Sequence, residues 1–199
     1  MPARIDAEER RHYVIEAAFR LIVAEGLEGL TLRKVAAEAD LNIGSVRHFF
    51  DGREGLLAAA AQEAGNRMGK RLTHHPVEQL RGLKGEEALV ALQDLLEQVL
   101  PVDEPRSVEA IVVLELIRAS RTQTVFASSA AQMASDLHDI IAAALACLEV
   151  PNPSAAARQV SALVGGLTLD TVTPHGSLTV YQLRSTLRDA LSNLLNAEM

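Results

Sequence analysis

Residues 42–48 combine residue types that can contact a nucleic-acid backbone and base edges. Gly44 lacks a Cβ atom, so a phosphate can approach the backbone there, near a predicted helix N-terminus whose dipole favours anions. Ser45, Arg47 and His48 point polar groups outward from the same predicted helix. Because arginine can donate a bidentate pair to guanine, we predict that Arg47 gives sequence specificity. An isolated arginine or histidine usually lies on a solvated helix face, so this prediction depends on the ordered combination.

Two other groups of residues could bind metal ions. Glu9 and His12 have the Glu-x-x-His spacing of di-iron helical bundles, but one copy of this motif cannot build the site. His74 and His75 are adjacent, so their side chains point apart on a helix, and no third ligand is near in sequence. A solvated helix end is the expected environment of these histidines. We predict no metal, no cofactor, no catalytic residue and no enzymatic activity.

Short helices are predicted to position residues 42–48. A first helix covers residues 6–25, where apolar residues recur at spacings of three and four, and Gly26 then supplies a stop. Thr31 is the predicted N-cap of a second helix of about two turns. Asn42 is the predicted cap of a third helix that ends at Phe50. Two short helices joined by a tight turn allow one helix to brace on a DNA backbone while the other lies in the major groove.

The rest of the chain also favours helices. A long helix over residues 53–72 is expected to connect two domains, and four or five further helices follow Gly85, with breaks at prolines and at residues 173–177. No stretch alternates convincingly enough to predict a strand. The sequence therefore predicts an all-α protein, with a three-helix, helix-turn-helix domain at residues 1–52 and a larger helical domain at residues 53–199.

Composition limits the expected compartment. With 199 residues and 48% apolar content, the chain can build a core without disulfides. Cys147 is the single cysteine, which excludes an internal disulfide and fits a reducing cytoplasm. The N-terminus is too charged for a signal-peptide core, and the longest apolar run, at residues 140–148, is far shorter than the roughly 20 residues of a membrane span. We expect a cytoplasmic protein without a membrane partner.

The stretch TLRKVAAEADLNIGSVRHFFDGREGLL resembles the helix-turn-helix signature of the TetR family of transcriptional regulators. The resemblance implies a ligand-responsive repressor that binds a palindromic double-stranded DNA operator as a homodimer and is released by a small molecule. Together with Gly44, which the missing Cβ atom suggests, the resemblance predicts phosphate or base contacts from eight residues. These are Thr31, Arg33, Asn42, Gly44, Ser45, Arg47, His48 and Arg53. Three residues depart from the family pattern: Asp40 replaces a turn glycine, Ile43 a common lysine and Arg47 a typical tyrosine. Aspartate tolerates left-handed dihedral angles, so we expect the turn to survive.

A helix-turn-helix reads too few base pairs alone, so two copies are expected to bind half-sites about 34 to 36 Å apart, or multiples of that spacing. The predicted dimer interface lies on the last two helices. It comprises Ala162, Gly165, Gly166, Leu169, Leu183, Leu187 and Leu191. Each helical glycine costs nearly 1 kcal/mol, and close approach of a partner helix would explain the Gly-Gly pair. The alternative is that these small residues pack within one chain.

An effector pocket is expected, by resemblance, among the middle helices. Glu115 interrupts an apolar run, with Arg118 one turn away, so the pair could orient a ligand. The predicted pocket residues are Glu115, Arg118, Phe126, Met133 and Leu137. The alternatives are a partly exposed ion pair and ordinary core residues. With no Trp, two Tyr and four Phe, the sequence disfavours large planar effectors and leaves the small molecule unidentified.

The charge balance argues against DNA binding. The net charge is −7, and residues 1–57 carry eight Lys or Arg against ten Asp or Glu. A basic excess is the usual electrostatic footprint of a DNA-binding domain. The alternative function is therefore a helical dimer that binds a small molecule or a protein, without DNA-binding activity.

Overall fold

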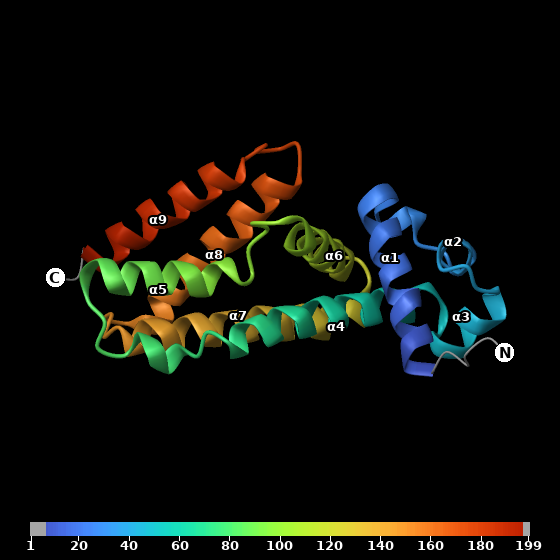
Figure 1. The fold of residues 1–199 in the computed structure, drawn as a ribbon, viewed down its shortest axis with the longest axis horizontal. Helices are drawn as coiled ribbons and strands as arrows, with labels where there is room; N and C mark the ends of the chain where they lie inside the picture. Colours follow the sequence, from blue (N-terminus) through green and yellow to red (C-terminus); the bar gives the residue numbers. More distant parts are fainter. Residues whose placement is uncertain (1–6, 197–199) are drawn as a thin grey trace. The chain divides into compact units, whose positions relative to one another are not determined.

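The computed structural model describes residues 7–196, and every regular element in this range is a helix (Figure 1). The helices are α1 (Ala7–Gly29), α2 (Leu32–Glu38), α3 (Ile43–Phe49), α4 (Gly52–Thr73), α5 (Gly85–Glu97), α6 (Glu104–Ser120), α7 (Ala127–Cys147), α8 (Pro153–Val172) and α9 (Val180–Asn196), with short 3-10 helices η1 (Val77–Leu80) and η2 (Thr124–Phe126). The predicted all-α fold, with a helix-turn-helix followed by a larger helical part, is confirmed.

Contacts divide the chain into two compact units. Unit 1 contains the described residues up to Asn66 together with Ile111–Ala130, and unit 2 contains Arg67–Ala110 and the described residues from Ala131 onward. The unit boundaries therefore fall inside α4, α6 and α7. None of the helices in the described range is both long and apolar enough to cross a membrane.

Helix α1 builds the core of unit 1 through one apolar face. The buried residues of this face include Val14, Ile15, Ala17, Ala18, Phe19, Leu21 and Ile22. At Gly26 the backbone leaves helical geometry, with φ 67° and ψ −169°, so the predicted stop is confirmed, although a further turn continues to Gly29. A residue with a Cβ atom would be strained at this positive φ. The expected first residue, Asp6, lies outside the described range.

Helices α2 and α3 begin at the caps that the sequence predicts. The Thr31 hydroxyl accepts a hydrogen bond from the backbone N–H of Lys34 at 3.2 Å, and Asn42 caps α3. Between the helices, Asp40 adopts φ 53°, which confirms that aspartate supports the left-handed turn. Val46, on the inner face of α3, is fully buried.

Unit 2 is organised around a core that α5, α7, α8 and α9 share. Leu92, Ile141 and Leu145 are completely buried in it. The apolar stripe of α9 consists of Leu183, Leu187 and Leu191, each with 0% exposure. We predicted these leucines at a dimer interface. Their side chains are instead covered by their own chain and hold α9 in the unit 2 core, so they have no surface for a partner.

A buried ion pair joins α4 to α6 inside unit 2. The Arg71 guanidinium donates to both carboxylate oxygens of Glu109, at 3.1 and 2.5 Å, and to the carbonyl oxygen of Gln98 at 2.9 Å. The Glu109 side chain is only 3% exposed. Burying a carboxylate is costly unless the charge is paired, so this bidentate contact explains how Glu109 is accommodated in the interior.

Candidate nucleic-acid interface

The N-terminus of α3 is fixed by a side-chain cap. The Asn42 Oδ1 atom accepts hydrogen bonds from the Ser45 backbone N–H at 2.8 Å and from the Ser45 hydroxyl at 3.2 Å. Gly44 is exposed, and a Cβ atom there would lie 3.1 Å from Asn42 Oδ1, a tight contact. Glycine therefore keeps the cap unstrained as well as leaving the backbone open to an approaching group.

The outer face of α3 carries cationic and polar groups. Arg47 and His48 are exposed and lie in the last turn of the helix. The His48 ring packs edge-on against Phe49, with ring centroids 5.3 Å apart. Val46, one residue earlier, points into the core. Val46 lies on the inner face of α3, so Arg47 and His48, the next two residues of the helix, lie on the surface, as the sequence predicts.

Helix α2 places two further predicted residues on the surface. Thr31 is exposed at its N-terminus, and Arg33 is exposed in its first turn. The neighbouring Lys34 ammonium pairs with the carboxylate of Glu25 on α1. Arg33 and Arg47 form no ion pair with any described residue. Both guanidinium groups are therefore free to meet an anionic partner.

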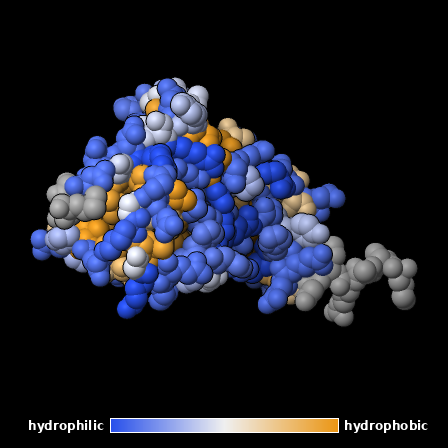
Figure 2. All heavy atoms as spheres, turned by 60° about the vertical axis from the view of Figure 1, so that its left-hand side comes forward, coloured by the Kyte–Doolittle hydropathy of each residue, from blue (hydrophilic) through white to orange (hydrophobic). Residues whose placement is uncertain are grey.

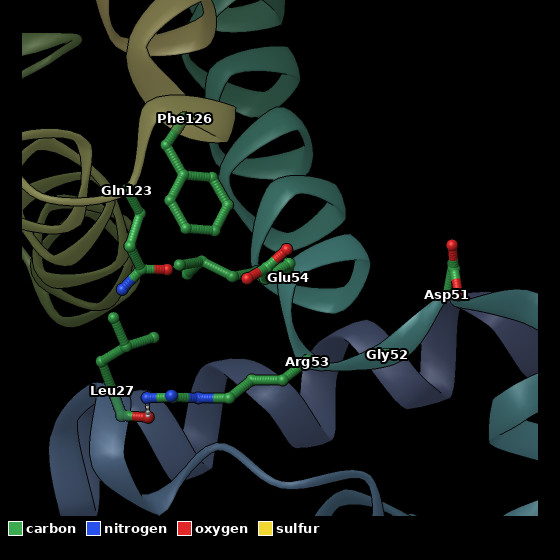
Figure 3. A pocket seen from close by; sticks show the side chains of 8 residues that line it. Leu27, Asp51, Gly52, Arg53, Glu54, Gln123 and Phe126 are labelled. Atoms are coloured by element: carbon green, nitrogen blue, oxygen red, sulfur yellow. Dashed lines mark hydrogen bonds between the residues drawn. The ribbon is translucent and has the colours of Figure 1, made fainter.

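Arg53 has partners within unit 1. Its guanidinium donates to the carbonyl oxygen of Leu27 at 2.5 Å (Figure 3). The guanidinium also lies 3.7 Å from the Glu28 carboxylate. Its Nε atom is buried. The resemblance implies a phosphate contact for Arg53, but the structure directs the side chain toward the segment after Gly26. We therefore assign Arg53 to bracing α4 against the end of α1.

Ion pairs within unit 1 engage three of its carboxylates. Arg20 on α1 pairs with Glu38 on α2 at 2.6 Å. Glu25 neutralises Lys34, and Glu28 faces Arg53. These carboxylates connect helices to one another, and α3 itself carries no acidic residue.

A cavity of about 230 Å³ lies within unit 1, at the start of α4 (Figure 3). Leu27, Arg53, Gln123 and Phe126 are among its lining residues. Phe126 is the predicted effector residue that lines it. The other lining residues come from separate segments, and no spacing in the sequence marks them.

The remaining predicted effector residues have separate environments. The Arg118 guanidinium donates to the Glu115 carboxylate at 2.7 Å, which is the partly exposed ion pair of the alternative interpretation. This hydrogen bond raises the pKa of Arg118. Met133 and Leu137 belong to unit 2, where Leu137 packs against the core. Their side chains are partly buried.

The small-residue face of α8 is open within the chain. Ala162, Gly165 and Gly166 are exposed, and Leu169 is 41% exposed. A Cβ atom on either glycine would meet nothing within 4 Å. Close packing inside one chain therefore does not explain the glycine pair.

The histidines that we considered as metal ligands serve local structure. His74 and His75 place their Nδ1 atoms 2.8 and 3.1 Å from the carbonyl oxygens of Lys70 and Arg71, near the end of α4. His12 lies 3.8 Å from Glu16. Within residues 7–196 no three His, Cys, Asp or Glu side chains form a group that could hold a metal ion.

Comparisons with known proteins cover both parts of the chain. Residues 89–196 match the family described as "BetI-type transcriptional repressor, C-terminal". Residues 14–60 match "Bacterial regulatory proteins, tetR family". The chain is also similar to the HTH-type transcriptional regulator PksA of Bacillus subtilis (strain 168), at 38% identity over 99 residues, which cover 50% of this chain and 46% of that protein. The match thus spans less than half of that curated relative.

Several solved structures match nearly the whole chain. One is a transcriptional regulator from Rhodococcus sp. Rha1, at 26% identity and a TM-score of 0.82, covering 94% of this chain and 96% of that one. Another is the multidrug binding protein EbrR complexed with malachite green, at 26% identity and a TM-score of 0.71, covering 94% and 98%. The arrangement of helices described above is therefore shared with proteins of this kind.

Proposed function

Since the chain belongs to the TetR family of transcriptional regulators, with a C-terminal part of the BetI type, we propose that it is a ligand-responsive repressor that binds a palindromic operator as a homodimer. We assign DNA binding to residues 1–52, and effector binding and dimerisation to residues 53–199. The DNA contacts that we propose come from Thr31, Arg33, Asn42, Gly44, Ser45, Arg47 and His48.

The observation that carries this proposal is the capped, outward-facing surface of α3. Asn42 fixes the start of the helix, Gly44 leaves its backbone open, and Arg47 is exposed without an ion-pair partner among the described residues. A fixed recognition helix with a free guanidinium suits bidentate hydrogen bonding to guanine in the major groove. Helix α3 itself carries no acidic residue, so the acidic excess of residues 1–57 does not lie on this helix.

A mobility-shift assay tests DNA binding directly. The purified full chain is titrated onto duplex DNA from the region upstream of its own coding sequence, at two salt concentrations, with Arg47→Ala and the exposed Arg121→Ala as matched charge losses. We expect the wild type to shift the DNA in a salt-sensitive manner. Only Arg47→Ala should lose about 1–3 kcal/mol of the free energy by which the protein discriminates the correct base from a wrong one. Absence of retention at low salt would favour the alternative, a helical binding protein without DNA-binding activity.

We place the dimer interface on the exposed face of α8. Ala162, Gly165, Gly166 and Leu169 share this face, and small residues let a partner helix approach closely across a two-fold axis. Figure 2 shows one face of the molecule, on which hydrophobic residues, in orange, form patches between hydrophilic ones. Among the large exposed apolar residues of unit 2 are Val90, Leu169 and Tyr181. Burial of such residues against a second copy would stabilise the dimer.

The effector that we propose is a small organic molecule, because EbrR, which shares the fold, has been crystallised with malachite green. We propose that the effector binds better to a conformer in which α4 holds the two helix-turn-helix domains of the dimer at a separation that does not fit the operator half-sites. Such coupling typically changes operator affinity by about 5- to 150-fold. Equal operator affinity with and without each small molecule recovered from the purified protein would contradict this mechanism.

A further inference from the structure

A cation on α1 lies beside the end of α3. The guanidinium carbon of Arg11 is 5.5 Å from the ring centroid of Phe50. Arg11 is exposed, whereas Phe50, the residue that caps the C-terminus of α3, is only 5% exposed. The buried ring is therefore a fixed platform for an exposed charge.

Three other cations of unit 1 are engaged within the chain. Arg20 and Lys34 pair with carboxylates across the α1–α2 contact, and Arg53 donates to Leu27. Arg11 has no ion-pair partner among residues 7–196. Its charge is consequently available to an external anion.

Arg53, which follows the junction between α3 and α4, donates its guanidinium to the Leu27 carbonyl oxygen. Phe50 lies at this junction, three residues before Arg53, so the contact with Phe50 brings the Arg11 guanidinium beside the C-terminal end of α3. Arginine can stack on an aromatic ring while the N–H groups at its edge donate to phosphate. Stacking also restricts the long side chain before binding, which lowers the entropy that binding must remove.

We propose that Arg11, held on the Phe50 ring, contacts a phosphate of the operator beside the C-terminal end of α3. This inference rests on the proposed DNA-binding function and adds a contact from α1 to it. A phosphate contact positions the protein on the duplex without reading its sequence. Loss of Arg11 should therefore weaken binding to all duplexes alike, whereas loss of Arg47 should change the preference among them.

The test compares the full-length wild type with Arg11→Ala, Arg11→Lys, Arg47→Ala and Arg121→Ala. The probes are a duplex that the wild type selects from a random library and one duplex of unrelated sequence, each titrated at four or more salt concentrations. Arg121 is exposed in unit 1 and matches the charge loss without belonging to the proposed interface. Circular dichroism verifies that each variant is folded.

We expect Arg11→Ala to weaken binding to both duplexes by about tenfold per subunit, as for one hydrogen bond to a charged group. The slope of log affinity against log salt should fall by about 0.9 per subunit. Arg11→Lys should keep this slope and bind with intermediate affinity, because lysine retains the charge without the planar stacking surface.

Two outcomes separate this inference from the proposed function. If the wild type binds DNA, but Arg11→Ala has the affinity and salt slope of Arg121→Ala, Arg11 makes no phosphate contact and the inference is wrong. If the wild type selects no duplex and is not retained on either probe, the proposed DNA-binding function fails, and the role of Arg11 fails with it.

Discussion

At the scale of single residues, Asn42 combines a structural and a proposed recognition role in one side chain. Its carbonyl oxygen accepts two hydrogen bonds from Ser45, so its amide nitrogen is left to donate to DNA. The cap is thus the feature that orients the proposed contact, because rotation of the amide would break both bonds to Ser45.

Two substitutions of Asn42 separate these roles. Asn42→Asp keeps an oxygen that caps α3 but replaces the donor with a negative charge, so we expect near-normal stability and strongly reduced DNA binding. Asn42→Ala should lose about 1 kcal/mol of stability, because the cap is removed. Urea unfolding and mobility shifts measure the two effects. Wild-type DNA affinity in Asn42→Asp would exclude a contact from this side chain.

The pair of Lys84 and Glu149 gives a pH dependence in unit 2. A hydrogen bond from the Lys84 ammonium lowers the pKa of the Glu149 carboxyl from its usual 4.5. A lowered folded-state pKa contributes stability above the unfolded pKa, and this contribution is lost as the pH falls through the folded pKa. The pair is exposed, so the effect should be small and screened by salt.

Lys84→Met tests this dependence through thermal unfolding between neutral pH and pH 3. We expect the wild type to be slightly more stable at neutral pH and the difference to disappear toward acid pH. A difference that stays constant over the whole range would show that Glu149 titrates as in the unfolded chain.

At the scale of elements, α4 is held by an arginine near each end. Arg53 donates to Leu27 within unit 1, and Arg71 binds Glu109 and the Gln98 carbonyl within unit 2. A helix fixed at both ends can transmit a displacement that bending or fraying would otherwise absorb. This makes α4 suited to the connector role that we propose for it.

Arg71→Met should destabilise unit 2 strongly. Removal of one partner leaves the Glu109 carboxylate buried without a counter-charge, which costs about 3–5 kcal/mol. The matched control is Arg118→Met, because Arg118 is 59% exposed and pairs with Glu115 at the surface. That loss should cost at most about 1 kcal/mol. Similar urea midpoints for the two variants would contradict the structural importance of the buried pair.

At the scale of the whole molecule, the proposed function requires two copies of the chain. A Gly166→Arg substitution on α8 tests the interface, since the new side chain has open space within its own chain but would clash with a closely packed partner. We expect a folded monomer in sedimentation and weakened operator binding. Replacing a helical glycine should even favour the isolated helix, by up to about 1 kcal/mol.

Gly69→Arg is the matched control for this experiment. Gly69 is an exposed helical glycine on α4, and a Cβ atom there also meets nothing within 4 Å. This variant should keep the mass of the wild type. If Gly166→Arg also keeps that mass, the α8 face is not the dimer interface.

The sequence by itself determined the helices of the helix-turn-helix and the residues that cap or end them. Thr31, Asn42, Gly26 and Asp40 act through hydrogen bonds or dihedral preferences that involve residues at most a few positions away. Such local interactions are fixed once the residue types are known, so both caps, the helix stop and the left-handed turn were predictable. The outward positions of Arg47 and His48 follow from the same helical period.

Only the tertiary structure decided which partner a side chain contacts when several partners are possible. Arg53 is 26 residues from the Leu27 carbonyl that it binds, and no sequence spacing indicates that contact. The stripe of α9 beginning at Leu183 could have covered a partner, but it fills the unit 2 core, while the exposed α8 glycines leave surface open. Periodicity gives the apolar face of a helix, whereas the identity of the covering surface depends on contacts between distant segments.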